Sequence, residues 1–126
     1  MREQLISSDK RDALWVLAYV YLKFGYFHDA AKLLLALDHL DAGSGWARRA
    51  RCLALLRAGH CEEAAAEAGL LLGRPLADEH RFRMLQVRVK AYWRLGLRSE
   101  ARTCQRMIAK LPIQATLPST SRGRPV

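Results

Sequence analysis

Hydrophobic residues recur at helical spacing in six stretches of the chain. In the first stretch Leu14, Leu17 and Tyr21 are three or four residues apart, so that they share one side of a helix. In the second, Ala30 and Leu34 repeat the pattern. This periodicity predicts six helices, over about residues 9–24, 27–40, 44–58, 61–72, 78–95 and 98–111.

Glycine and proline divide these stretches. Gly25, Gly59 and Gly96 each follow a periodic segment directly, which is typical of a helix C-terminus. Gly43-Ser44-Gly45 ends the second segment, Gly73-Arg74-Pro75 ends the fourth, and Pro112 stops the sixth. We therefore expect three short turns between helices and two longer junctions.

Capping residues mark the predicted helix starts. Asp9 is expected to cap the first helix and Ser44 the third, while Asp78 caps or opens the fifth. Residues 1–8 are then an N-terminal lead. Residues 112–126 contain three prolines, several Ser and Thr and no acid, which is typical of a mobile tail.

The same spacing separates two series of small residues. The glycines are Gly25, Gly59 and Gly96, and the alanines are Ala30, Ala64 and Ala101. In both series the first step is 34 residues and the second is 37. A period of about 34 is that of tetratricopeptide repeats, in which each repeat is a pair of antiparallel helices. The predicted fold is all-α: three tetratricopeptide-like helix pairs, about 11–43, 44–77 and 78–111, in a short right-handed solenoid domain over 9–111.

The repeat signature is met unevenly. Its first part is Trp-x2-Leu-Gly-x2-Tyr, and the first repeat has Leu14-x2-Leu17-Ala18-x2-Tyr21. In the second and third repeats Arg51 and Arg88 replace the core leucine. Either those helices are rotated, or the arginine stems lie along the surface.

Charge is distributed unevenly along the chain. The 126 residues carry a net charge of +9. Residues 1–47 hold five basic and six acidic residues, net −1, and residues 48–126 hold sixteen basic and six acidic, net +10. Such a field favours an acidic partner, a nucleic acid or an anionic surface. Arg98, Arg102, Arg106 and Lys110 form a ladder that either faces an acidic partner or is a plain exposed face.

No pattern points to catalysis, a cofactor or a metal. The chain has no Gly-x-Ser-x-Gly, phosphate-loop or dinucleotide motif, and its His and Cys residues lack paired zinc spacing. We expect a protein that is not an enzyme. The three cysteines are odd in number and form no Cys-x-x-Cys, which favours a reducing cytoplasm. The most apolar run, 13–22, is too short to span a bilayer, so no membrane insertion is expected.

An ordered set of segments resembles a narrower family, the type III secretion chaperones, and within them the YscY type. After an apolar first helix that ends in a glycine turn come AKLLLAL (31–37), RRARCLAL (48–55) and EEAAAEA (62–68). The resemblance extends over about residues 13–111. It implies a bacterial cytoplasmic chaperone for a small secreted export component, YscX-like, in a 1:1 heterodimer. Chaperones of needle subunits and of translocators in the same systems share this architecture and stay as alternatives.

The phase of the repeat predicts the partner-binding groove, because the first helix of each pair lines the concave side of a solenoid. The expected lining residues are Trp15, Tyr19, Leu22, Trp46, Arg49, Leu53, Leu56, Arg83, Gln86, Lys90 and Trp93. All three tryptophans belong to this set, and Trp, Tyr and Arg often dominate binding energy. The competing interpretation is that these aromatics pack between neighbouring repeats.

Two further expectations concern partners. Three repeats are near the lower limit for stability, so we expect partner-dependent stability or self-association. A different functional class, a basic helical-repeat protein that binds nucleic acid, is the alternative that the high net charge leaves open.

Overall fold

Six helices and no strands make up the part of the chain that the computed structural model describes, residues 2–40 and 45–112, with side chains from residue 10 onward. The helices are α1 (Arg2–Lys23), α2 (Phe27–Leu40), α3 (Trp46–Arg57), α4 (Cys61–Leu72), α5 (Asp78–Arg94) and α6 (Arg98–Ala109). The predicted all-helical class is therefore confirmed. None of the described helices is both long and apolar enough to cross a membrane.

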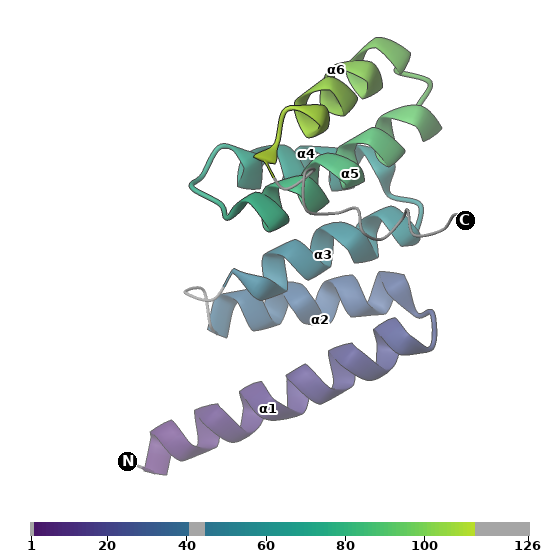
Figure 1. Ribbon diagram of the computed structural model, residues 1–126. Helices are drawn as coiled ribbons and strands as arrows, with labels where there is room; N and C mark the ends of the chain where they lie inside the picture. The colour runs from purple at the N-terminus through teal and green to yellow at the C-terminus, as the bar shows by residue number, and fades with distance from the viewer. Residues whose placement is uncertain (1, 41–44, 113–126) are drawn as a thin grey trace, which may run out of the picture.

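Each helix packs mainly against the next one along the chain. This holds for every pair from α1 and α2 to α5 and α6, and α3 also packs against α5. Figure 1 shows the helices in a row, with α1 at one end and α6 at the other. The first helices of successive pairs also meet, since α3 packs against α5 and Trp15 of α1 stacks on Trp46 of α3.

One turn geometry joins the two helices of every pair. At the end of α1, Gly25 has φ 83°, a conformation that is cheap only for glycine. The Tyr26 amide donates to the Tyr21 carbonyl at 2.8 Å and the Gly25 amide donates to that of Leu22 at 3.4 Å, which is a Schellman motif. The Tyr21 and Tyr26 rings meet edge to face at 5.8 Å. The same two bonds close the other turns, around Gly59 (φ 91°) and Gly96 (φ 79°).

The repeated alanines lie in the core. Ala30, Ala64 and Ala101 are each the fourth residue of the second helix of a pair, and each has no exposed surface. A larger side chain there would separate the helices. The largest fully buried side chains are Leu34, Leu37, Met84, Leu85, Val87 and Cys52.

The predicted helix bounds hold best where glycine sets them. Helices α2 and α4 span the predicted residues. Helix α1 differs, because it begins at Arg2 and Asp9 lies inside it. Most of the predicted lead is therefore helical, since residues 2–6 are mainly good helix formers and an aspartate is tolerated within a helix.

The starts of α3 and α5 depend on other residues than expected. Ser44 lies outside the described residues, and the N-cap of α3 is Gly45 with φ 72°. Ala77 is the N-cap of α5, so Asp78 opens that helix. The predicted tail falls almost entirely on residues 113–126, which are also outside the described part.

The two arginines that replace core leucines lie along the surface of their helices. Helix α3 keeps the predicted phase, because Cys52 and Leu55 are buried. Arg51 contacts Glu63 of α4 at 3.0 Å and Glu67 at 3.5 Å, across the junction of the two helices. The stem is half-buried while the charged end meets carboxylates.

Among the side chains that the structure describes, no carboxylate lies within ion-pair distance of Arg88, and its guanidinium contacts an aromatic ring. Its guanidinium lies 5.1 Å from the centre of the Tyr92 ring and donates a hydrogen bond to the Tyr92 hydroxyl. Gly69 of α4 makes room, because a Cβ there would be 3.2 Å from Arg88 Cζ. Both guanidinium groups therefore have a local partner, while the Nε atom of each is buried without a hydrogen-bond partner among the described residues.

Candidate functional site

A hollow of about 270 Å³ lies between α3 and α5. Its wall from α3 includes Trp46, Arg49 and Leu53, and Arg83 comes from α5. These four residues belong to the predicted groove, and the structure places them together although α3 and α5 belong to different helix pairs. Aromatic, aliphatic and guanidinium groups here share one surface.

A second hollow, of about 230 Å³, adjoins the first. Leu22 from the end of α1, Phe27 from α2 and Leu53 from α3 line it, with Arg57 at its edge. The Arg57 guanidinium lies 5.6 Å from the centre of the Phe27 ring. Because Leu53 lines both hollows, they form one continuous surface from α1 through α3 to α5, which we call the α1–α3–α5 surface.

Trp15 and Trp46 stack on one another between α1 and α3. Their ring centroids are 4.0 Å apart and the planes differ by 18°. This pair therefore packs between neighbouring repeats, and Trp46 also lines the first hollow, so a role of Trp46 in partner binding stays a prediction. Stacking holds the Trp46 ring in one orientation at the margin of the surface.

The remaining predicted residues fall into two groups. Leu56 is only 3% exposed, so its side chain belongs to the core and is not available to a partner. Its carbonyl accepts a hydrogen bond from Arg94 at 2.9 Å, which ties α3 to α5. The exposed residues that line neither hollow are Tyr19, Gln86, Lys90 and Trp93.

Residues that the sequence interpretation missed complete the first hollow. Glu79, His80 and Met84 of α5 lie beside Arg83. Glu79 and His80 precede Arg83 by four and three residues, so helical spacing puts all three on one face. That spacing was the available signal. Glu79 adds one acidic group to an otherwise basic margin.

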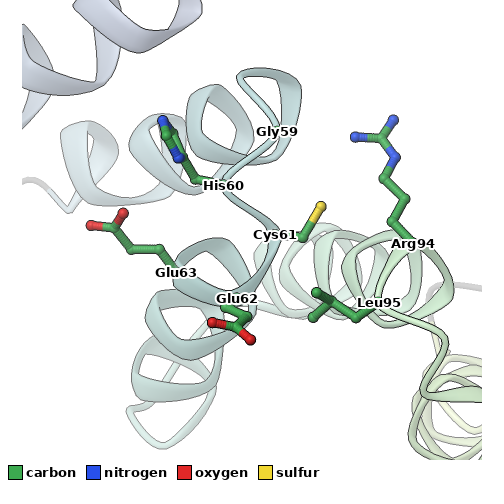
Figure 2. Close-up of a pocket in the computed structure, with 7 residues that line it drawn as sticks. All are labelled: Gly59, His60, Cys61, Glu62, Glu63, Arg94 and Leu95. Atoms are coloured by element: carbon green, nitrogen blue, oxygen red, sulfur yellow. The ribbon is translucent and has the colours of Figure 1, made fainter.

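A third hollow, of about 460 Å³, lies at the turn between α3 and α4 and beside the end of α5 (Figure 2). Figure 2 shows the His60 and Cys61 side chains diverging, with Cys61 toward Arg94 and His60 on the other side of the turn. The His60 Nε2 lies 3.0 Å from Nδ1 of His28. This imidazole does not approach the thiol, so the two do not form a nucleophile–base pair.

The thiols are poorly suited to nucleophilic chemistry. All three cysteines are buried and unpaired by disulfides. Burial raises the pKa of Cys52 from 9.0 to about 12, with the nearby Glu67 carboxylate adding to the rise. Burial also raises the pKa of Cys104. Among the described residues, no group of three or more His, Cys, Asp or Glu is placed to hold a metal ion.

Comparison with known proteins yields no relative. No protein-family model, no curated protein and no solved structure matches the chain.

Proposed function

We propose that this chain is a tetratricopeptide-like scaffold whose three helix pairs form a short right-handed solenoid. The support is the recurrence of one Schellman turn at steps of 34 and 37 residues and of a buried alanine five residues after each turn glycine. The sequential packing of the helices agrees with a stack of repeats, in which each pair contacts its neighbours.

The proposed role is that of a bacterial cytoplasmic chaperone in a type III secretion system. It binds a small secreted export component of the YscX kind and holds it until export. The observation that supports a binding role is the α1–α3–α5 surface, where Trp46, Leu53, Arg49 and Arg83 converge from separate repeats. The secretion role rests on the resemblance of residues 31–37, 48–55 and 62–68. Needle-subunit and translocator chaperones remain the alternatives of the same class.

The chemistry of this surface selects the kind of segment that fits. Leu53 is 38% exposed at the junction of two hollows, a place for apolar anchors of an amphipathic helix or extended segment. Arg49 and Arg83 at the margin favour acidic residues beside those anchors. Covering an apolar segment keeps the partner from aggregating before export.

Affinity purification tests the role directly. Tagged protein is isolated from its native cells at low salt, and the bound material is analysed by mass spectrometry and for nucleic acid. A small secretion-system protein at 1:1 stoichiometry supports the proposal, and its identity distinguishes the export component from a needle subunit or translocator. RNA or DNA that high salt releases, without such a protein, would contradict it and favour the nucleic-acid alternative.

Substitution tests the surface once a partner has been captured. Leu53→Ala removes the shared apolar wall and Arg83→Glu reverses a marginal charge, and each is expected to weaken the complex roughly tenfold or more. Leu70→Ala is the matched control, because Leu70 is 60% exposed on α4, outside the two hollows. Affinities by titration calorimetry that are equal for all three variants would place the partner elsewhere.

A further inference from the structure

An exposed apolar stripe runs along α1. Ala13, Val16, Val20 and Phe24 follow one another at steps of three or four residues, so they lie on one side of the helix. Val16 is 64% exposed, Val20 37% and Phe24 69%. Leu22, which lines the second hollow, and Trp15, which stacks on Trp46, are seven residues apart on a different side of α1.

In the other two repeats, the residues that correspond to this stripe are covered by a neighbouring helix. At the repeat steps of 34 and 71 residues, the counterparts of the first three stripe residues are Ala47, Ala50 and Ala54 in α3 and Met84, Val87 and Ala91 in α5. All of these are buried except Ala50, which is half-buried. Helix α3 has α2 packed on it and α5 has α4 packed on it. Among the described helices, α1 has no counterpart of α2 or α4.

The opposite end of the row differs in character. The exposed residues of α6 include Arg98, Arg102 and Arg106, and the exposed Lys110 caps its C-terminus. A helix end of this polarity is suited to water, as terminal repeats usually are. The end formed by α1 instead leaves apolar side chains in water, and a covering helix would bury them.

The charges that flank the stripe indicate which helix covers it. Asp12 and Lys23 are exposed and eleven residues apart, close to three full turns, so both lie along the same edge of the stripe, Asp12 just before Ala13 and Lys23 just before Phe24. Lys23 Nζ lies 5.9 Å from the centre of the Tyr19 ring, which borders the stripe. In an antiparallel pair of α1 helices, Asp12 of one copy meets Lys23 of the other at both ends. In a parallel pair, Asp12 would face its own copy.

We propose that the stripe is a homodimer interface, in which two α1 helices pack antiparallel about a two-fold axis. Around that axis Val16 of one copy lies opposite Tyr19 of the other, and two Asp12–Lys23 pairs flank the apolar contact. A two-fold contact of this kind is self-complementary and closed, so it stops at two copies. The inference does not rest on the secretion role, because Val16 and Phe24 lie outside the α1–α3–α5 surface.

Analytical ultracentrifugation of the full chain over a concentration series tests the interface. Wild type is expected to be a dimer that dissociates on dilution. Val16→Asp puts two unpaired carboxylates into the contact and should weaken it at least about a hundredfold. Leu70→Asp, at a residue of similar exposure (60%) on α4, should leave the dimer intact. Circular dichroism checks that both variants keep their helices.

Three results would overturn the proposal. Wild type that is monomeric at every concentration would show that no second copy covers α1. Equal effects of Val16→Asp and Leu70→Asp would exclude a specific role for the stripe. Loss of the dimer in Leu53→Ala, with Val16→Asp unaffected, would move self-association to the α1–α3–α5 surface.

Charge exchange tests the antiparallel arrangement. Asp12→Lys replaces attraction by repulsion at both ends and should weaken the dimer roughly tenfold. Adding Lys23→Asp restores opposite charges only if the helices are antiparallel, so the double variant should recover wild-type dissociation. A double variant as weak as the single one would contradict this arrangement.

Discussion

At the scale of single residues, Cys52 couples the core to the pH of the solution. Its side chain has no exposed surface, and burial raises its pKa from 9.0 to about 12. The unfolded thiol therefore ionises first as the pH rises. Since the folded state holds a proton that the unfolded state has lost, the contribution of Cys52 to stability is fully present below about pH 9 and declines as the pH rises from about 9 toward 12.

Between pH 8 and pH 10 we expect the free energy of unfolding of wild type to fall by about 1.4 kcal/mol more than that of Cys52→Ala. The reason is that pH 10 lies one unit above the pKa of the unfolded thiol, and each such unit is worth about 1.4 kcal/mol. Urea unfolding of both proteins at the two pH values measures this difference. The variant is the internal control, because it keeps every titratable group of wild type except the Cys52 thiol. Parallel losses in the two proteins would show that the Cys52 proton is not linked to folding.

At the scale of helices, the glycine turns set the geometry of each pair. Gly59 has φ 91°, and a Cβ there would meet nothing within 4 Å. Gly59→Ala therefore changes only the backbone energy, and should lower the free energy of unfolding by about 1 kcal/mol. Gly73, with φ −77°, is the control, since alanine is compatible with that conformation. Thermal unfolding compares them, and an equal loss at Gly73 would contradict the strain argument.

These local rules explain which helices could be predicted. Gly25 and Gly59 end α1 and α3 through turns whose chemistry lies within a few residues, so α2 and α4 were predicted to the residue. Asp9 was misleading because a capping residue type is also tolerated inside a helix, and the good helix formers before it extend α1 to Arg2.

The candidate site was predictable only in part. Helical phase brought Trp46, Leu53 and Arg83 to one surface, because that phase is a property of the repeat. It placed Leu56 there too, yet Leu56 is buried, and the contact of its carbonyl with Arg94 of α5 is a long-range feature that no local pattern contains. The stacking of Trp15 on Trp46 likewise depends on how α1 and α3 approach.

At the scale of the whole molecule, a row of helices is unevenly stable. Helix α3 packs against α2, α4 and α5, whereas α2 is the main neighbour of α1. Opening a terminal helix exposes less apolar surface than opening a central one, so local unfolding should cost less at α1 and α6 than at α3.

Hydrogen exchange monitored by mass spectrometry connects this gradient to self-association. At low protein concentration, amides of α1 should exchange faster than those of α3, because α1 can detach while the rest stays folded. At high concentration a second copy binds only the folded α1 face, so mass action should slow exchange in α1 and leave α3 unchanged. In Val16→Asp the α1 amides should exchange equally fast at both concentrations. Concentration-dependent protection that moves to α5 and α6 would instead place the contact at the opposite end of the row.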